Sequence, residues 1–265
     1  MLPLIIEPEH LEAHLSDPNL LVIDLCRPES YTTGHLPGAV PVSPADLICG
    51  IRPAVGKLPD LDHLNSLFSS IGYSPDKQLV VYDDEGGGWA GRFIWTLDVI
   101  GHKTSSYLNG GIHAWMALNL PLTDEAPSVD PTDVQLELDY RFIAEKDDVL
   151  GAITDSNIQI WDARSAEEFD GTKVVSRRGG HIPGAINLDW LDTMDRDNHL
   201  KLRTDMQALL DSKGFDRQKS IITHCQTHHR SGLTYLIGKM LGYNIRAYPG
   251  SWSEWGNETD TPIES

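Results

Sequence analysis

An internal repeat constrains the fold of this chain more than any other feature of its sequence. The segment LLVIDLCRPESYTTGHLPGAVPV begins at Leu20, and IQIWDARSAEEFDGTKVVSRRGGHIPGAINL begins at Ile158. Each contains an apolar run that ends in Asp, a Glu five residues later, an aromatic residue, and then the motif Gly-His-aliphatic-Pro-Gly-Ala. Such similarity between distant segments indicates two copies of one structural unit in tandem.

The repeat continues beyond this motif and sets the domain boundaries. QLVVYDDEGGGWAGRFIWTLDVIGH parallels KSIITHCQTHHRSGLTYLIGKMLGY, and each predicts a strand, a polar loop and a helix that stops at a glycine, Gly101 or Gly242. Between the copies, DEAPSVDPTDV has the proline and acid content of a linker. We therefore predict a first domain over residues 1–125, a linker over 126–140 and a second domain over 141–265.

The alternation of strands and helices within each copy predicts an α/β fold. LLVID, LVVYD, IQIWD and SIITH are short, mostly apolar runs, as expected of strands covered on both faces. Helical candidates between them include residues 9–16, 62–71 and 204–213. This order favours two similar domains, each with a mainly parallel β-sheet and helices on both faces. Ligands of such sheets bind at the carboxyl ends of the strands.

Composition narrows the classes of partner. The chain of 265 residues is 40% hydrophobic and carries 21 basic and 39 acidic residues, for a net charge of −18. A nucleic-acid or acidic-membrane binder needs a basic field, which this chain lacks. No apolar run approaches the ~20 residues of a membrane span, and the first residues make a poor signal peptide. We expect small-molecule substrates and binding to neither nucleic acid nor membranes. We also expect a monomer, because the repeat supplies a pseudo-symmetric partner within the chain.

Cysteine usage indicates the compartment and argues against a metal site. Cys26, Cys49 and Cys225 are odd in number and widely spaced, which suits neither a disulfide framework nor a zinc site. We therefore expect a reducing compartment, the cytoplasm, and neither a metal nor an organic cofactor.

The strand-to-helix turn at Cys225 contains the most reactive combination of residues. Cys225 ends an apolar run, and a helical pattern begins near Ser231. Backbone amides of this short loop and the following helix N-terminus can converge on an anion. Such amides and cationic neighbours lower the pKa of a thiol, so the loop favours a nucleophilic thiolate. The loop residues are Gln226, Thr227, His228, His229, Arg230 and Ser231.

A cysteine at a strand end is more often a small core residue than a nucleophile, so the duplicate copy matters. There the segment is DDEGGGW, with Asp83 at the cysteine position. The shared fold therefore requires neither the cysteine nor the histidines and arginine, and chemistry explains them better. We predict Cys225 as the nucleophile and treat Cys26 and Cys49 as bystanders. The two GHxPGA motifs occur in both copies and are interpreted as structural turns.

The tandem Asp, Glu, aromatic and GHxPGA pattern, followed by a strand and a cysteine loop, resembles the two-domain rhodaneses over essentially the whole chain. The loop CQTHHR resembles that of bacterial thiosulfate–cyanide sulfurtransferases. It matches neither the CRKGVT loop of the mammalian thiosulfate enzymes nor the CGSGVT loop of mercaptopyruvate sulfurtransferases. The resemblance implies an inactive first domain, with Asp83 in place of the cysteine, and a catalytic second domain.

The resemblance also implies the reaction and the roles of the loop. Cys225 takes a sulfane sulfur from thiosulfate as a persulfide and passes it to cyanide or another thiophilic acceptor. Amides from Gln226 to Ser231 stabilise the persulfide, and Arg230 binds the sulfonate oxygens of the donor. Thr227 stands where the mammalian loop has a lysine. Supporting roles fall to an Asp162–Arg164 ion pair and to Trp190, which walls the pocket.

Three alternatives stay open from the sequence. A persulfide carrier for cofactor biosynthesis would use the same chemistry for another purpose. A cysteine phosphatase of the same fold also places a histidine before the cysteine, as His224 is here. A phosphate-binding loop, however, has five residues between Cys and Arg, and Gln226 to His229 are four. A non-enzymatic regulatory module is the third alternative, and the intact Cys225 and Arg230 argue against it.

Overall fold

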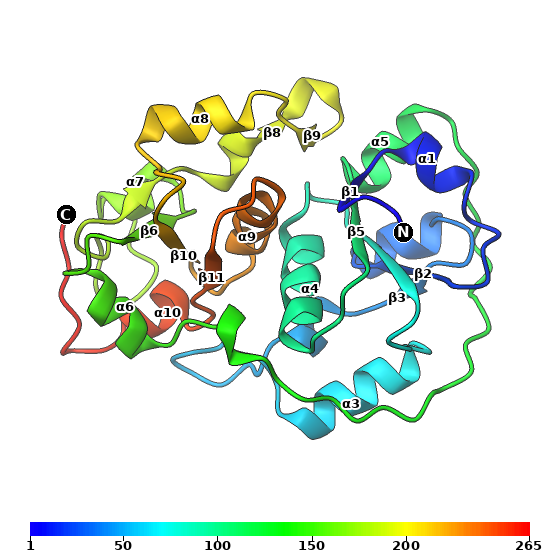
Figure 1. The fold of residues 1–265 in the computed structure, drawn as a ribbon, viewed down its shortest axis with the longest axis horizontal. Helices are drawn as coiled ribbons and strands as arrows, with labels where there is room; N and C mark the ends of the chain where they lie inside the picture. Colours follow the sequence, from blue (N-terminus) through cyan, green and yellow to red (C-terminus); the bar gives the residue numbers. More distant parts are fainter. The chain divides into compact units, whose positions relative to one another are not determined.

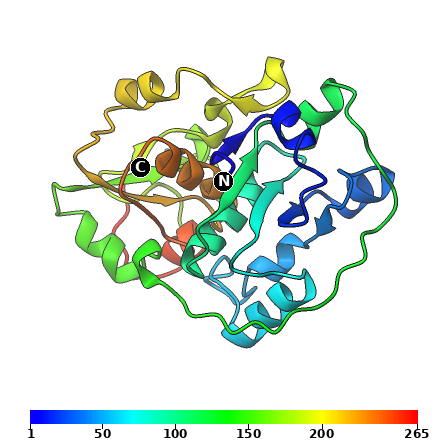
Figure 2. The ribbon, with the colours of Figure 1, turned by 45° about the vertical axis from the view of Figure 1, so that its right-hand side comes forward.

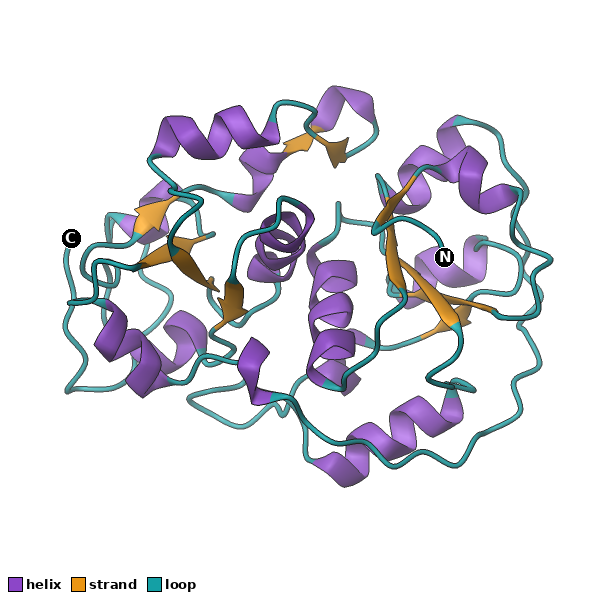
Figure 3. Cartoon of the chain, in the orientation of Figure 1, coloured by secondary structure: helices purple, strands orange, loops and turns teal.

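The repeat corresponds to two separate parallel β-sheets in the structure, a computed structural model that describes residues 1–265. Contacts divide the chain into two units, each of which contains strands and helices (Figures 1 and 3). Unit 1 comprises Met1–Leu47, Pro59–Asp139 and Met194–Leu202, and unit 2 comprises Ile48–Leu58, Tyr140–Thr193 and Arg203–Ser265. The α/β class predicted from the repeat is confirmed.

Unit 1 contains a five-stranded sheet in the order β1-β5-β4-β2-β3, in which all neighbouring strands are parallel. Its strands are β1 (Ile5–Ile6), β2 (Leu20–Asp24), β3 (Val40–Pro41), β4 (Gln78–Tyr82) and β5 (Ser105–Leu108). They run side by side in both views of the ribbon (Figures 1 and 2). Asp24 of β2 pairs in register with Tyr82 of β4, so Asp83 leaves the sheet at the carboxyl edge.

Helices cover both faces of the sheet of unit 1. They are α1 (Pro8–Glu12), α2 (Pro28–Thr33), α3 (Leu61–Ser70), α4 (Gly88–Val99) and α5 (Gly111–Ala117), with a 3₁₀ turn η1 (Pro44–Leu47). Val22 and Val80 face the side of α1 and α5, where they join a buried cluster with Trp115. On the opposite side the rings of Phe68 from α3 and Phe93 from α4 lie 5.7 Å apart. Side chains alternate between the faces of a strand, which explains why both faces of β4 are apolar.

Unit 2 repeats this architecture with four parallel strands in the order β11-β10-β6-β7. The strands are β6 (Ile158–Asp162), β7 (Ile186–Asn187), β10 (Ser220–His224) and β11 (Ile245–Ala247). Around them lie α6 (Lys146–Ala152), α7 (Ala166–Phe169), α8 (Met206–Lys213), α9 (Arg230–Met240), α10 (Ser251–Trp255), η2 (Tyr140–Phe142) and η3 (Trp190–Thr193). His224 is in register with Asp162, so both strands end beside Cys225.

Two short segments cluster with the unit that the repeat does not assign them to. Residues 48–58 pack within unit 2, where Lys57 pairs with Glu145 at 2.7 Å. Residues 194–202 form the antiparallel pair β8 (Met194–Asp195) and β9 (Lys201–Leu202) around η4 (Arg196–Asn198), within unit 1. There Lys201 pairs with Glu7 at 2.7 Å. The division expected from the repeat, with boundaries at 125 and 141, does not include the assignment of residues 48–58 to unit 2 and of residues 194–202 to unit 1.

The predicted helices differ from the observed ones mainly at their ends. The helix expected over 62–71 is α3, shifted by one residue, and the one expected over 204–213 begins at Met206. The helix expected over 9–16 is wrong in its second half, because α1 ends at Glu12. The backbone then continues in tight turns, in which the amides of His14 and Leu15 donate to carbonyls three residues earlier.

Candidate active site around Cys225

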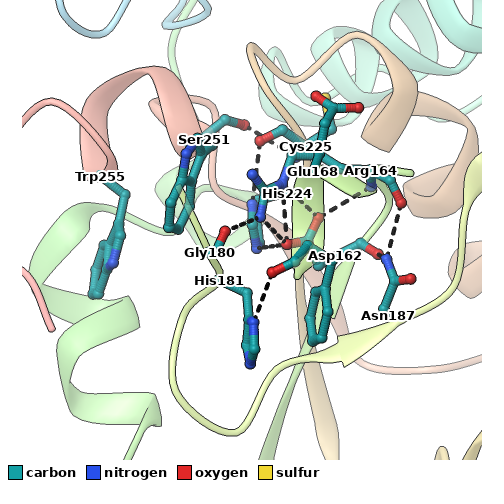
Figure 4. Close-up of polar contacts among 12 residues, drawn as sticks. Asp162, Arg164, Glu168, Gly180, His181, Asn187, His224, Cys225, Ser251 and Trp255 are labelled. Carbon is teal, nitrogen blue, oxygen red and sulfur yellow. Dashed lines mark hydrogen bonds and ion pairs between the residues drawn. The ribbon is translucent and has the colours of Figure 1, made fainter. Parts of the chain in front are cut away.

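Cys225 lies between the end of β10 and the start of α9, and only 1% of its surface is exposed. The N-terminal turn of α10 fixes its backbone. The amide of Cys225 donates to Ser251 Oγ at 3.3 Å, and the amide of Trp252 donates to the Cys225 carbonyl at 2.9 Å (Figure 4). The amide of Ser253 donates to the Gln226 carbonyl at 2.8 Å. The start of the loop is therefore held in one position, as a nucleophile requires.

The loop has an unusual backbone conformation at His228. Its φ is 56°, in the left-handed region where glycine is favoured, and the equivalent residue in unit 1 is Gly86, with φ 95°. A non-glycine residue in this region costs on the order of 1 kcal/mol or more. The His228 ring offsets part of this cost by a 2.7 Å hydrogen bond between Nδ1 and Ser231 Oγ. Both units thus make the same turn with different residues.

The surroundings of Cys225 favour its thiolate. Burial opposes ionisation, but the charge of Arg230, hydrogen bonds from the side chain and backbone of Ser231, and the charge of His229 together lower the pKa of the thiol. A lowered pKa raises the fraction of the nucleophilic form at neutral pH. In unit 1, by contrast, burial and the nearby Asp24 raise the pKa of Cys26, which makes that thiol inert.

Arg230 is held by a carboxylate that the sequence did not reveal. Its Nη1 donates to Glu168 Oε2 at 2.6 Å and its Nη2 donates to Oε1 at 2.9 Å, a bidentate pair. The Glu168 side chain is only 4% exposed. Burial opposes its ionisation, but the hydrogen bonds and charge of Arg230 lower its pKa below the usual range. Two N–H donors of Arg230, the residue that was expected to bind a donor anion, are therefore already bonded to Glu168.

A second ion pair lies at the ends of β6 and β10. Arg164 Nη2 and Asp162 Oδ2 are 2.6 Å apart, and both side chains are almost fully buried (Figure 4). Arg164 also donates to the Gly180 carbonyl at 2.9 Å and stacks on the Trp252 ring at 4.2 Å. With these contacts Arg164 is a supporting residue that is shielded from solvent, not one that is open to substrate.

His224 connects this buried pair to Cys225. Its Nδ1 lies 3.2 Å from the Cys225 carbonyl, which accepts, and its Nε2 lies 3.6 Å from Asp162 Oδ2 (Figure 4). Burial lowers the pKa of His224 against the opposing charge of Asp162. A neutral ring at this position adds no positive charge beneath Cys225, so Arg230 is the main cationic partner of the thiolate.

The remaining candidate residues surround the loop. Trp190, in η3, contacts the His229 ring edge-to-face, with the ring centroids 5.5 Å apart. The side-chain Nε2 of Gln226 donates to Ser176 Oγ at 3.1 Å. The Thr227 carbonyl is approached so closely by Gly56 that a Cβ at position 56 would lie 2.2 Å from it. Gly56 belongs to the segment 48–58, which thus supports the cysteine loop within unit 2.

A pocket lies on the Gln226 side of the loop and has a cavity volume of about 520 Å³. The residues lining it include Arg52, Ser176, Arg177, Gln226 and Asn257. Two guanidinium groups on the rim of a chain with net charge −18 provide a local positive site next to the loop.

The equivalent loop of unit 1 shows how this turn holds an anion. Asp83 Oδ1 accepts from the amides of Glu85, Gly86 and Gly87 at 3.2, 3.1 and 2.8 Å. Its Oδ2 accepts from the amide of Ala90 at 3.0 Å. The carboxylate is fully buried and is satisfied by these four backbone donors. The turn is therefore an anion cradle in unit 1, and the amides at the same positions in unit 2 are those of Thr227, His228, His229 and Gly232.

The GHxPGA motifs have the same structural role in both units. His35 Nδ1 bonds to the Tyr31 carbonyl at 2.9 Å and stacks on that ring, and His181 does the same with Phe169 at 2.8 Å. The glycine that follows the proline has a positive φ in each copy, at Gly38 and Gly184. Neither histidine contacts the cysteine loop through these bonds, in agreement with the structural interpretation.

The structure contains no group of three or more His, Cys, Asp or Glu side chains arranged to hold a metal ion. None of its helices combines the length and the apolar character needed to cross a bilayer.

Comparison with known proteins relates both units to one family. The family model of the rhodanese-like domain matches residues 7–118 and 145–258. A thiosulfate sulfurtransferase of Azotobacter vinelandii is 50% identical over 99% of this chain and 97% of its own length, and one of Pseudomonas aeruginosa is 47% identical over the same shares. The crystal structure of SseA from Escherichia coli, described as a 3-mercaptopyruvate sulfotransferase, superposes with a TM-score of 0.81 at 27% identity and covers 95% of this chain and 99% of that one.

Proposed function

Because the chain belongs to the rhodanese family, with two rhodanese-like domains, we propose that it is a thiosulfate sulfurtransferase that works through a persulfide on Cys225. The thiolate of Cys225 attacks the outer sulfur of thiosulfate, the S–S bond of the donor breaks, and sulfite leaves with the bonding electron pair. A thiophilic acceptor such as cyanide then attacks the outer sulfur of the persulfide, which yields thiocyanate and restores the thiolate.

The Asp83 cradle carries this proposal. An aspartate oxygen is separated from its Cα by the same number of bonds as the outer sulfur of a cysteine persulfide. Asp83 therefore places a negative charge where a Cys225 persulfide would place its own, within an equivalent turn. The amides of Thr227, His228, His229 and Gly232 are positioned by homology of the turn to stabilise that charge. The lowered pKa of Cys225 supplies the attacking thiolate.

The proposal divides the loop by task. Ser231 and the loop amides stabilise the thiolate and the persulfide, and Arg230 provides the full charge that a donor anion needs. Trp190 covers the loop beside His229 and limits the access of water to the persulfide. Asp162, Arg164 and His224 keep the ends of β6 and β10 aligned beneath Cys225.

We also propose a cellular location and an oligomeric state. The three free cysteines suit a reducing compartment, so we place the protein in the cytoplasm. We propose a monomer as well, because the chain already contains both members of the repeat. Light scattering at the concentration of the assay tests the second point, and a stable dimer would contradict it.

Steady-state assay of cysteine variants tests the function. Thiocyanate formation from thiosulfate and cyanide should be abolished in Cys225→Ser and retained in Cys49→Ser, the control for a thiol that is only partly buried. Loss of activity in the control alone, or turnover by Cys225→Ser, would refute the assignment. Replacing cyanide by a dithiol then shows whether transfer to a thiol is faster, as a persulfide carrier would require.

A further inference from the structure

The Glu168–Arg230 pair occurs in only one of the two copies of the fold. By alignment of the repeat, Ser30 stands at the position of Glu168 and Gly88 at that of Arg230. Unit 1 forms the same strand, turn and helix without either charge. The pair is therefore not needed for the turn, and its restriction to the unit with the cysteine links it to the chemistry.

Glu168 is placed firmly by its own helix. It is the third residue of α7, where Ser165 Oγ accepts from its amide and its carboxylate accepts from the Ser165 amide, both at 3.4 Å. This capping box fixes the helix start, while the carboxylate faces Arg230 from a nearly buried position. Nη1 and Nη2 of Arg230 each donate one hydrogen bond to this carboxylate.

A second cation lies within reach of the same carboxylate. Lys173 Nζ is 4.0 Å from Glu168 Oε2, and the lysine side chain is 62% exposed. A contact of this length on an exposed side chain contributes little as it stands, yet it needs only a small movement to become a direct ion pair. Glu168 thus has one strong partner, Arg230, and one weak partner, Lys173.

We propose that Glu168 is a resident counter-anion of Arg230 that the donor anion displaces, and that Lys173 then receives the released carboxylate. The proposal rests on the function proposed above. Glu168 is a positioning residue, because it acts on the donor through Arg230. Before donor binding it keeps the guanidinium in place and partly offsets its charge. During donor binding the sulfonate takes over the Arg230 donors, and the Glu168–Lys173 contact shortens.

This exchange has opposite consequences for the two half-reactions. Without the Glu168 charge, Arg230 is free to bind thiosulfate, so the donor should bind more tightly. The same free charge stabilises the persulfide anion more strongly, so transfer of its sulfur to the acceptor should slow down. A residue with only a structural role would slow both half-reactions together.

The test uses Glu168→Gln, which keeps the shape and one acceptor oxygen but removes the charge. We expect the KM for thiosulfate to fall about five- to tenfold, while cyanide attack on the preloaded persulfide slows by a similar factor. The control is Glu12→Gln, the same change at an exposed glutamate of α1 in unit 1, which should leave both steps unchanged. Slowing of both half-reactions by Glu168→Gln, or no change in either, would overturn the proposal.

Lys173→Met tests the receiving partner. Without the lysine, the displaced carboxylate has no cation, so the KM for thiosulfate should rise several-fold with little change in cyanide attack. The matched control is Lys213→Met, at an exposed lysine of α8. An unchanged KM in Lys173→Met would remove Lys173 from the exchange and overturn that part of the proposal.

A third measurement separates this inference from the proposed function. The pH profile of Cys225 alkylation by iodoacetamide needs no sulfur donor. With Arg230 released, the profile of Glu168→Gln should move to lower pH by about one unit. If the wild-type protein forms no persulfide but this shift is present, the donor assignment fails and the control of Arg230 by Glu168 stands. An unshifted profile contradicts the control by Glu168 whatever the donor is.

Discussion

The charges around Cys225 decide how readily single residues at this site can react. Arg230 lies between two anions, the thiolate that it stabilises and the carboxylate of Glu168 that holds it. Beneath them, Asp162 and Arg164 neutralise one another in a buried pair. Arg230 is therefore the main cationic partner of the Cys225 thiolate, and substitutions of this arginine should have their largest effect on the step that binds an anionic donor.

Arg230→Ala should raise the KM for thiosulfate and slow persulfide formation more than cyanide attack. The loss of one charged hydrogen-bonding partner corresponds to about 2–3 kcal/mol, or roughly thirty- to a hundredfold in kcat/KM. Arg230→Lys should recover only part of this, because the point charge of an ammonium cannot reproduce the planar donors that the guanidinium offers to the sulfonate oxygens. Stopped-flow measurement of each half-reaction separates the two steps.

A control is needed because Arg230→Ala leaves the Glu168 carboxylate buried without its main partner, which itself destabilises the protein. The double variant Arg230→Ala/Glu168→Gln removes that stranded charge. If the double variant recovers stability but not donor binding, the arginine serves the donor. Full recovery of persulfide formation would show that the arginine matters only as the partner of Glu168.

The sequence predicts Cys225 as the nucleophile but does not reveal Glu168 as the ion-pair partner of Arg230, for a physical reason. Cys225, the loop and Arg230 are contiguous, so their proximity follows from chain connectivity alone. Glu168 is 62 positions from Arg230 and follows another glutamate at the start of a helix, where acidic residues are common on solvated surfaces. Only the pairing of β6 with β10 brings α7 next to the catalytic loop.

The same strand, turn and helix occur once in each unit, and the two turns enclose different side chains. In unit 1 the turn between β4 and α4 encloses the Asp83 carboxylate, and in unit 2 the turn between β10 and α9 encloses a thiol. Buried backbone donors need acceptors, and Asp83 supplies one for four amides of its turn. Unit 1 is thereby stabilised as a folded unit by the residue that stands at the position of Cys225.

Asp83→Asn should destabilise the protein, and by an amount that depends on pH. Burial and the charge of Glu85 raise the pKa of Asp83 from 3.8 to about 6. A raised pKa means that the stability contributed by this titration is fully present below the unfolded value and is lost as pH rises through about 6. The difference in unfolding free energy between wild type and variant should therefore be larger at about pH 5 than at about pH 7.5. Urea titrations at both pH values measure it, and a difference that is independent of pH would contradict the raised pKa.

Gly56→Ala should weaken the support of the catalytic loop. A Cβ at this position would lie 2.2 Å from the Thr227 carbonyl and 2.6 Å from that of Pro249, so the backbone must move. We expect a loss of about 1–3 kcal/mol of stability together with reduced turnover. Gly151→Ala in α6 is the control, because nothing lies within 4 Å of its Cβ. Thermal unfolding and the steady-state assay of both variants test this expectation. A Gly56→Ala protein with the stability and turnover of the control would show that the close contact at Gly56 does not support the loop.

The strands and the sites at their ends could be predicted from apolar runs, but the packing of residues 48–58 could not. The predicted strands LVVYD and SIITH correspond to β4 and β10, because runs of this type are buried on both faces. The segment around Gly56 has no apolar periodicity, and its contacts within unit 2 include ion pairs of Lys57 with Glu145 and Glu254 and a hydrogen bond from Ser253 to the Pro53 carbonyl. Such long-range polar contacts leave no local pattern in the sequence.

The net charge of the whole molecule repels an anionic donor, whereas the arginines near the cysteine loop attract it. The chain carries a charge of −18, while thiosulfate is a dianion, so long-range electrostatics oppose its approach. Arg230, and the arginines that line the pocket beside Gln226, form the local positive field. The repeat itself predicted two α/β domains correctly, since each copy contains a complete set of strands for its sheet.

Added salt should therefore accelerate the use of thiosulfate at low ionic strength. Raising sodium chloride to about 0.15 M shortens the screening length to about 8 Å, which weakens the repulsion by distant acids more than the attraction by Arg230. The value of kcat/KM for thiosulfate should rise several-fold over this range. A monotonic fall with salt would show that local attraction, and not the overall charge, controls association.

The Cys225 persulfide can be detected in the intact mass of the protein, measured after incubation with thiosulfate and again after cyanide. We expect thiosulfate to add the mass of one sulfur atom, peptide mapping to place this atom on Cys225, and cyanide to remove it. Cys225→Ser should stay at its original mass, while Cys26→Ser should behave as the wild type because that thiol is buried and inert. A sulfur found on another residue, or no added sulfur in an enzyme that still turns over thiosulfate, would contradict the account.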